Sequence, residues 1–175
     1  MRRLILLRHA KSDWPQNTTD HDRPLAVRGR EQAPLIGRYL ADELIIPDLA
    51  MVSTARRAQE TWALVKDPFA ENIAQRDEPR LFGAAADLVI ALVQGANSTA
   101  RTIICVGHNP GFHDAARMLT GHGDRYAFAR MQAHFPTCAL AVIDFNVEDW
   151  TGVAPGEGRL DRFLTPKMLG GEDSP

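Results

Sequence analysis

The chain has 175 residues, of which 45% are hydrophobic and 24% are charged, and this composition is typical of one folded domain with a substantial core. The formal net charge of -2 at pH 7 excludes a generally basic protein that binds nucleic acid or an anionic membrane, so an anion must bind at a local cluster of cations. No apolar run is long enough to cross a bilayer and no signal-peptide pattern is present, so we expect a cytoplasmic protein.

Short apolar runs predict the strands of this chain. The first run has four apolar residues in succession, which is too short for a helix and suits a central strand buried on both faces of a sheet. Similar runs recur along the chain, and one irregular stretch after Pro68 allows a further short strand. The predicted strands are residues 4–7, 49–52, 72–75, 102–106, 138–145 and, at an edge of the sheet, 159–164.

Apolar residues at helical spacing predict helices between these strands. A helix over residues 30–44 would hold Pro34 in its first turn, where the missing N–H is tolerated, and would end before Pro47. The other predicted helices are residues 87–94, a segment with Ala58, Trp62 and Val65 on one face, and a segment with Phe112, Ala116 and Leu119 on one face that ends at Gly121.

The order of these elements predicts the fold class. Strands and helices alternate, which indicates an α/β fold, a three-layer α/β/α sandwich with a mostly parallel central sheet. No repeat or linker interrupts the pattern, so we expect a single domain over residues 1–169 and a disordered tail over 170–175. Cys105 and Cys138 lie in apolar runs, and we expect two buried, reduced thiols, with a disulfide as the alternative.

Cationic side chains follow three of the predicted strands. Arg8 and His9 follow the first strand, Arg56 and Arg57 follow the second, and His108 follows the third well-marked strand. The carboxyl ends of parallel strands share one edge of a sheet, and ligands bind at that edge. Two imidazoles and at least two guanidinium groups in one pocket are costly unless an anion neutralises them. The sequence therefore predicts a phosphate site.

These residue types permit phosphoryl transfer through a covalent intermediate. A neutral imidazole can attack phosphorus in line, while the arginines and a second histidine hold the equatorial oxygens and water later hydrolyses the phosphohistidine. The attacking nitrogen keeps its lone pair only if the far ring nitrogen is protonated and anchored, most simply by a backbone carbonyl. The scheme requires no metal and no other cofactor.

Five motifs follow one another in the chain and together span most of it. They are Leu7-Arg8-His9-Ala10, Asp20-His21-Asp22-Arg23-Pro24-Leu25 followed by Arg28-Gly29, a Ser-x-x-x-Arg-Ala-x-x-Thr pattern from Ser53 to Thr61, Val106-Gly107-His108-Asn109-Pro110-Gly111, and Phe135-Pro136-Thr137. In this order they resemble the histidine phosphatase superfamily, and within it the SixA-type phosphohistidine phosphatases. The resemblance implies a phosphoglycerate-mutase-like fold. Ala10 stands where most of the superfamily has Gly, a departure that SixA-like sequences share.

The resemblance also implies roles for individual residues. The catalytic residues would be His9 as the nucleophile and Arg8, Arg57 and His108 as a phosphate clamp. The substrate-binding residues would be Arg8, Arg57, His108, Asn109 and Arg23. Arg57 aligns with the family arginine because it lies four residues after Ser53, and Arg56 would then be a solvated neighbour.

A general acid is difficult to place in this sequence. Many superfamily members carry a Glu that protonates an alkoxide leaving group, but Asp77 and Glu78 are only weak candidates for it, and SixA-like members resemble this chain in lacking one. A phosphoramidate protonated on nitrogen needs less help to leave. We therefore expect a metal-independent phosphatase acting on phosphohistidine, with a phosphorelay protein such as a histidine phosphotransfer domain as its partner. The alternatives are a small-molecule phosphomonoesterase and a non-catalytic module that binds phosphorylated partners.

The loop before the first predicted helix leaves two questions open. One question concerns Asp20, His21 and Asp22, which could form a hydrogen-bonded lip of the site or bind a metal ion. The sequence has no matching metal ligand elsewhere, which favours the lip. Trp14 could gate the pocket or cover the edge of the sheet.

Overall fold

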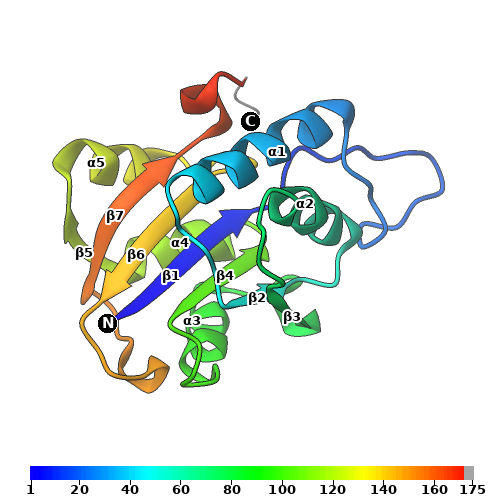
Figure 1. Ribbon diagram of the computed structural model, residues 1–175. Coiled ribbons are helices and arrows are strands. Elements are labelled where there is room, and N and C mark those ends of the chain that lie inside the picture. Colours follow the sequence, from blue (N-terminus) through cyan, green and yellow to red (C-terminus); the bar gives the residue numbers. More distant parts are fainter. Residues whose placement is uncertain (172–175) are drawn as a thin grey trace.

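A seven-stranded sheet forms the centre of the molecule, and the structure, a computed structural model, describes residues 1–171 (Figure 1). The strands are β1 (Arg2–Arg8), β2 (Leu49–Val52), β3 (Ala74–Asp77), β4 (Thr102–Gly107), β5 (Thr120–Gly123), β6 (Leu140–Phe145) and β7 (Gly158–Leu164). Their order in the sheet is β3-β2-β4-β1-β6-β7-β5. The first four strands in that order are parallel to one another, β6 is antiparallel to both β1 and β7, and β5 is parallel to β7. The mostly parallel sheet confirms the predicted fold class.

Helices cover both faces of the sheet. They are α1 (Val27–Asp42), α2 (Arg56–Lys66), α3 (Ala86–Gln94), α4 (Gly111–Leu119) and α5 (Arg125–Ala133), with short 3-10 helices η1 (Pro79–Leu81), η2 (Trp150–Gly152) and η3 (Pro166–Leu169). α1 and α2 pack on one face, and α3, α4 and α5 pack on the other (Figure 1). Within the described residues, none of these helices is long and apolar enough to span a membrane.

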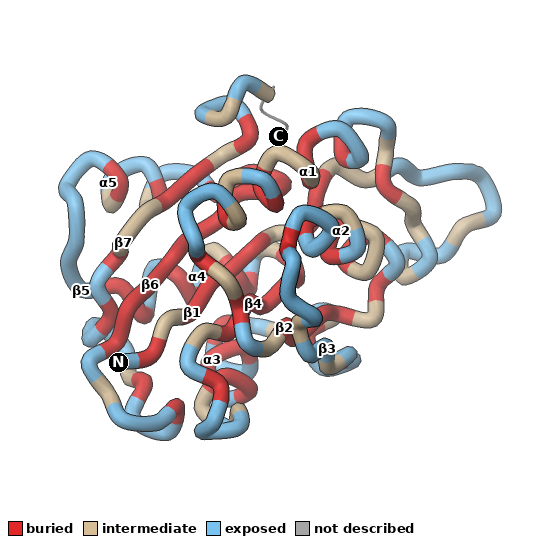
Figure 2. Tube along the Cα trace, viewed as in Figure 1, coloured by how far each residue is buried: buried red, intermediate tan, exposed pale blue. Residues whose placement is uncertain are grey.

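The central strands are apolar at successive positions because both of their faces are buried. In β1, Leu4 and Leu6 belong to one core cluster, whereas Ile5 and Leu7 belong to the cluster on the opposite face. Figure 2 shows this strand and its neighbours as buried along most of their length. Such a strand has no polar side, so the change from Leu7 to the polar residues that follow marks the end of the buried sheet.

The two cysteines are separate, buried free thiols, as expected from the sequence. Burial raises the pKa of Cys105 and of Cys138 to about 12 in each case. A thiolate, which is the reactive form of cysteine, therefore does not form near neutral pH.

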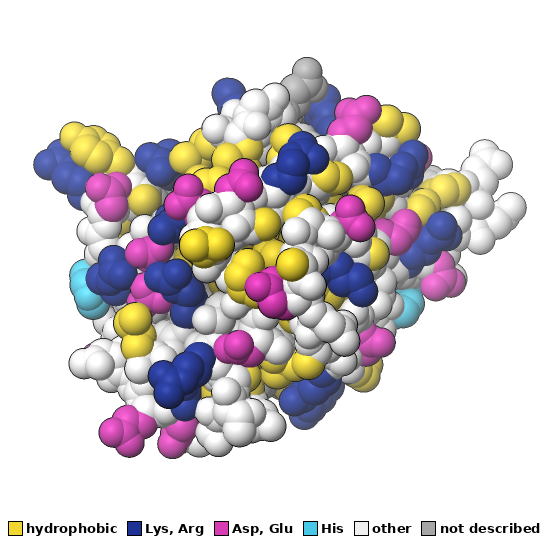
Figure 3. Space-filling model, viewed as in Figure 1, with side chains coloured by type: hydrophobic (Ala, Val, Ile, Leu, Met, Phe, Trp, Pro, Cys, Tyr) yellow, Lys and Arg dark blue, Asp and Glu magenta, His cyan; other side chains and the backbone are white. Residues whose placement is uncertain are grey.

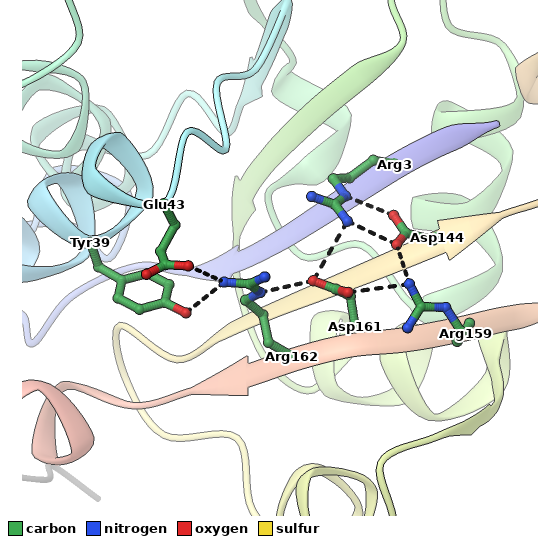
Figure 4. A network of polar contacts seen from close by, with 7 residues as sticks. All are labelled: Arg3, Tyr39, Glu43, Asp144, Arg159, Asp161 and Arg162. Carbon is green, nitrogen blue, oxygen red and sulfur yellow. Dashed lines mark hydrogen bonds and ion pairs between the residues drawn. The ribbon is translucent and has the colours of Figure 1, made fainter.

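An ion-pair network holds the antiparallel part of the sheet together at the end where β1 begins (Figure 4). Arg3 Nε donates to the buried Asp144 carboxylate at 2.7 Å, and Arg159 Nη2 donates to the same carboxylate at 2.9 Å. The three residues are cross-strand neighbours on β1, β6 and β7. A buried carboxylate that lost one of these partners would be uncompensated, so the network fixes the register of the three strands.

The strand predicted at an edge over residues 159–164 lies inside the sheet, so that part of the prediction was wrong. β7 pairs with β6 on one side and with β5 on the other. β5 was not predicted because it contains two glycines and no alternating apolar residues. The prediction that Gly121 ends a helix was also wrong, because α4 ends at Leu119 and Gly121 belongs to β5. A Cβ on Gly121 would lie 1.9 Å from the Gly156 carbonyl oxygen. Close backbone contact is the reason for this glycine.

α1 begins at Val27, earlier than predicted, and Pro34 consequently lies inside the helix instead of in its first turn. The start of the helix is set by a tertiary contact that periodicity does not reveal. The N–H of Ala26 donates to the Lys11 carbonyl oxygen at 2.9 Å, and a Cβ on Gly29 would lie 2.2 Å from that same oxygen. The first turn of α1 therefore packs directly on the chain segment that follows β1.

Two further differences concern weakly patterned segments. β3 spans residues 74–77 and not the predicted 72–75, and its side chains are mostly exposed, so no apolar pattern marks its position. α5 was not predicted, because only Ala127 and Met131 are buried on it. Its start is fixed locally, since the Asp124 side chain accepts hydrogen bonds from two backbone N–H groups of the first turn.

The predicted disordered tail is only partly within the described residues. The first two residues of that range form a turn, in which the Gly171 N–H donates to the Pro166 carbonyl oxygen at 2.7 Å and Gly170 has a φ of 90°. A glycine in the left-handed region thus closes η3. The remainder of the range, residues 172–175, lies outside the described residues.

Candidate active site

The carboxyl ends of β1, β2 and β4 meet at one edge of the sheet, beside a pocket of about 310 Å³. The pocket is lined by Arg8, His9, Lys11, Ser12, Arg23, Arg57, His108, Asn109 and Thr137, which include every site residue proposed from the sequence. Acidic and basic side chains are interspersed on the face shown in Figure 3, whereas the acidic residues are missing from the pocket lining. The pocket thus concentrates positive charge that the net charge of the chain does not reveal.

His9 is oriented by the backbone. Its Nδ1 lies 2.7 Å from the Ala10 carbonyl oxygen, and since a carbonyl can only accept, Nδ1 carries the proton and donates. Nε2 therefore carries the lone pair, and it accepts the N–H of Arg57 Nε at 3.4 Å. Burial, followed by the charges around the ring, lowers the pKa of His9 well below its usual value. At neutral pH the side chain is a neutral imidazole with a nucleophilic nitrogen, the state that in-line attack requires.

One hydroxyl connects the segment after β1 to the start of α2. Thr61 Oγ1 donates to the Arg57 carbonyl oxygen at 2.7 Å and accepts the Ala10 N–H at 3.0 Å. The Thr61 side chain is fully buried. This buried hydroxyl therefore links the backbone next to His9 to the backbone of Arg57.

Arg57 and Arg56 are adjacent in sequence but lie in different surroundings. The Arg57 guanidinium is buried and donates from Nη1 to the Asp20 carbonyl oxygen at 2.6 Å, with the Asp20 carboxylate 3.5 Å from Nη2. Arg56 is exposed and pairs with Glu60 on α2 at 3.2 Å. The structure thus brings Arg57, and not Arg56, together with His9.

The carbonyl oxygen of Phe135 holds two side chains of the pocket. It accepts a hydrogen bond from Arg8 Nη1 at 3.2 Å and one from Asn109 Nδ2 at 2.8 Å. Burial, and after it the charge of Arg57, lowers the pKa of Arg8. A bound anion would relieve the mutual repulsion of these two guanidinium groups.

Ser53 fixes the ring of His108. Its Oγ lies 2.7 Å from Nε2 of the ring and accepts the Ala55 N–H at 3.2 Å. Burial, followed by the charge of Arg57, lowers the pKa of His108 to about 4, so the ring is neutral at pH 7. Donation from the Ser53 hydroxyl to Nε2 would put the ring proton on Nδ1, which is the tautomer that can donate to a phosphoryl oxygen.

Three buried polar atoms of pocket-lining residues have no hydrogen-bond partner among the described residues. They are Arg8 Nε, His108 Nδ1 and Thr137 Oγ1. Buried polar atoms are almost always paired, so three such atoms around one pocket fit a ligand rich in acceptor oxygens. Thr137 was missing from the predicted site, although the Phe-Pro-Thr motif could have indicated it. Lys11 and Ser12 were also missed, and their position directly after the first motif was the available signal.

Arg23 organises the loop at the mouth of the pocket. Its guanidinium donates to Ser12 Oγ at 2.7 Å and to the Asp20 carboxylate at 3.1 Å. It also lies 4.4 Å from the centre of the Trp14 ring, a cation–π contact. Trp14 is 60% exposed. These contacts place Trp14 at the mouth of the pocket, next to Arg23.

Asp20 and its two neighbours belong to the same loop. Asp20 binds both Arg23 and Arg57, while His21 Nε2 lies 3.0 Å from Thr54 Oγ1. Within residues 1–171, no group of three or more His, Cys, Asp or Glu side chains is arranged to hold a metal ion. These hydrogen bonds agree with the interpretation that Asp20, His21 and Asp22 form a hydrogen-bonded lip of the site.

Neither weak candidate for the general acid is in the pocket. Glu78 is buried between Arg76 and Arg80, at 2.7 and 2.9 Å. The hydrogen bond from Arg80 is the largest effect that lowers the pKa of Glu78 to about 2, so this carboxylate is deprotonated at neutral pH. Asp77 is exposed and accepts hydrogen bonds from Gln59 and Gln75.

Acidification is expected to destabilise the protein through His108. The folded pKa is about 4 and the unfolded value is 6.5, so the unfolded state binds a proton first and stability falls as the pH drops from 6.5 toward 4. The full effect is on the order of 3 kcal/mol. Unfolding free energies from denaturant titrations at several pH values measure it. His108→Asn should flatten this pH dependence, whereas His122→Asn, at an exposed position, should not. Parallel curves for wild type and His108→Asn would contradict the assignment.

Known proteins resemble this chain in sequence over most of its length. The sequence model of the histidine phosphatase superfamily (branch 1) matches residues 4–81. The uncharacterized protein Rv1276c of Mycobacterium tuberculosis is 35% identical over 163 residues, and the match covers 92% of this chain and 100% of that one.

Solved structures match nearly the whole of this chain and have the same fold. The "putative phosphohistidine phosphatase SixA" of Agrobacterium tumefaciens is 30% identical, with a TM-score of 0.78 over 94% of this chain and 99% of that one. The protein of the same description from Nakamurella multipartitia is 26% identical, with a TM-score of 0.83 over 94% and 96% of the two chains.

Proposed function

The chain belongs to the histidine phosphatase superfamily, and on this premise we propose that it hydrolyses phosphohistidine on a phosphorylated protein. The observation that carries the proposal is the state of His9. Its Nδ1–H is held by the Ala10 carbonyl, and its Nε2 is available in a pocket lined by cations. The similarity to the two solved structures described as SixA phosphohistidine phosphatases supports the same class of substrate.

The reaction has two steps. In the first, the lone pair of His9 Nε2 attacks phosphorus, and the P–N bond to the substrate imidazole breaks as the new P–N bond forms. Arg8, Arg57 and the Nδ1–H of His108 bind the non-bridging oxygens, whose charge is redistributed in the transition state. In the second step, water attacks the phosphorus on His9, inorganic phosphate leaves, and the free imidazole is regenerated.

The three unpaired polar atoms of the pocket could bind the non-bridging oxygens of the phosphoryl group. A phosphoryl group offers acceptors for Arg8 Nε, His108 Nδ1 and the hydroxyl of Thr137, which would remove the cost of leaving three buried polar atoms unpaired. Bound substrate would also place negative charge next to His9 and His108, whose neutral forms are favoured by burial.

The lining of the pocket favours a nitrogen leaving group over an oxygen one. A substrate imidazole that carries a proton leaves as the neutral ring, whereas an alkoxide, with a pKa far above 7, needs a nearby acid. The lining contains no carboxylic acid, and Glu78, the buried one of the two sequence-based candidates, is ionised and bound to two arginines. Phosphohistidine is the substrate that this set of residues can process without further help.

Substrate preference tests the proposal. Phosphate release would be measured from a histidine-phosphorylated phosphotransfer domain and from glycerol phosphate, each with and without a metal chelator. We expect kcat/KM to be about 100-fold or more higher for the phosphoprotein, which is the lower range of the contribution of a general acid, and to be insensitive to chelator. An equal or higher kcat/KM for glycerol phosphate would contradict the proposal and favour the small-molecule phosphomonoesterase.

A further inference from the structure

A second hollow lies between α5, the end of β7 and η3, and we call it the basic-rimmed groove. Its volume is about 320 Å³. The lining consists of four apolar residues, Ala133, Pro136, Phe163 and Met168, and of Thr165, Arg130, His134 and Lys167. Met168 is 48% exposed, so its apolar side chain is accessible to a bound partner. The groove thus combines an apolar floor with basic side chains around it.

The basic side chains of the groove are available to a partner. Within residues 1–171, Arg130, His134 and Lys167 make no side-chain hydrogen bond or ion pair. By contrast, Arg159 and Arg162 on β7 both pair with Asp161. No acidic residue lines the groove, so its local charge is positive although the chain as a whole has a charge of -2.

The groove opens at the same edge of the sheet as the catalytic pocket. β7 is antiparallel to β6, which is antiparallel to β1, so β7 and β1 run in the same direction and end at the same edge (Figure 1). Leu7 of β1 pairs with Leu140 of β6, and Leu140 pairs with Leu164 of β7. Two strand spacings separate Leu7 from Leu164, which is about 10 Å.

The groove and the pocket are also joined by one chain segment. The ring of Phe163 on the groove floor lies 5.4 Å from the ring of Phe135, whose carbonyl oxygen holds Arg8. Pro136 lines the groove and the next residue, Thr137, lines the pocket. A molecule bound in the groove would therefore lie beside a substrate bound at His9.

We propose that the basic-rimmed groove binds the part of the phosphoprotein that lies next to its phosphohistidine, an apolar side chain flanked by Asp or Glu. This inference rests on the proposed function and names the chemistry of the partner. The apolar side chain would be buried against Phe163 and Met168, and the carboxylates would meet Arg130 and Lys167. Complementary charge at this place orients the partner and speeds its association.

Two synthetic phosphohistidine peptides test the inference without knowledge of the natural partner. One peptide carries Glu-Leu-Glu three to four residues after the phosphohistidine. An extended chain rises about 3.3 Å per residue, so this spacing covers the roughly 10 Å between the pocket and the groove. The other carries Lys-Leu-Lys there. We expect the wild type to hydrolyse the acidic peptide with a kcat/KM roughly tenfold higher, mostly through a lower KM, as two exposed charge pairs change from repulsion to attraction.

A charge-reversed variant assigns this preference to the groove. The groove variant, Arg130→Glu combined with Lys167→Glu, should abolish or invert the preference for the acidic peptide. The control variant, Lys66→Glu combined with Arg101→Glu, changes the net charge by the same amount at exposed positions near the opposite edge of the sheet. It should keep the preference. Hydrolysis of free phosphohistidine should be the same in all three proteins. A retained preference in the groove variant, or an equal loss of activity on free phosphohistidine, would overturn the inference. No hydrolysis of any phosphohistidine compound by the wild type would instead contradict the proposed function.

Discussion

His9→Ala is expected to lower kcat for phosphohistidine hydrolysis by about 10⁴-fold or more, as expected for the loss of a covalent nucleophile. The remaining cations can still bind a phosphoryl group, but no other imidazole nitrogen is presented in the same way. His108 is held differently from His9, because its Nε2 lies 2.7 Å from Ser53 Oγ and no backbone carbonyl among the described residues holds its Nδ1.

The His9→Ala variant should fold normally, so the loss can be assigned to chemistry. The side chain of His9 bonds only the adjacent Ala10 carbonyl and Arg57, and the backbone bonds of His9 to Gly107 and Cys138 remain. Phosphate release by single-turnover kinetics is the measurement, with His122→Ala at an exposed position as the control. A variant that kept more than about a tenth of the wild-type rate would exclude His9 as the nucleophile.

Arg57→Ala is the second change with a large expected effect, about 100-fold or more in kcat, by analogy with the loss of one oxyanion-hole donor. The guanidinium is the group that contacts His9 Nε2, so it lies where the phosphorus will be attacked and can stabilise charge on the oxygens during transfer. Arg57→Lys keeps the charge but not the planar fork, and we expect it to recover only part of the rate.

Arg56→Ala is the matched control for Arg57→Ala. Arg56 is the preceding residue on the same helical turn, but it is exposed and pairs with Glu60, so its removal should change kcat by less than about twofold. Circular dichroism should show both variants folded. A large loss with Arg56→Ala and none with Arg57→Ala would transfer the role to Arg56.

The central strands and the clamp could be predicted because their signals are local. Leu4 to Leu7 are apolar in succession since both faces of β1 are covered, and polar residues follow where the sheet ends. The parallel order of β1, β4 and β2 then brings Arg8, His108 and Arg57 to one edge. Neither inference requires knowledge of a distant contact.

The remaining features depend on contacts between distant parts of the chain. β5 has two glycines and is held by pairing with β7, and the start of α1 is set by the Lys11 carbonyl. The link from Ser53 to His108 spans 55 residues, so its effect on the ring tautomer could not be predicted from sequence spacing. Thr137 lies in the pocket because β6 is antiparallel to β1, and antiparallel pairing was not part of the prediction.

The most direct test of the account is to find the phosphoryl group on the enzyme. Wild-type protein would be mixed with a histidine-phosphorylated phosphotransfer domain, stopped within milliseconds under alkaline denaturing conditions, and its peptides analysed by mass spectrometry. We predict a transient phosphohistidine in the peptide that contains His9, absent from His9→Ala and decaying at the rate of phosphate release. Turnover of the phosphoprotein with no phosphoryl group on His9, or with one on another residue, would contradict the account.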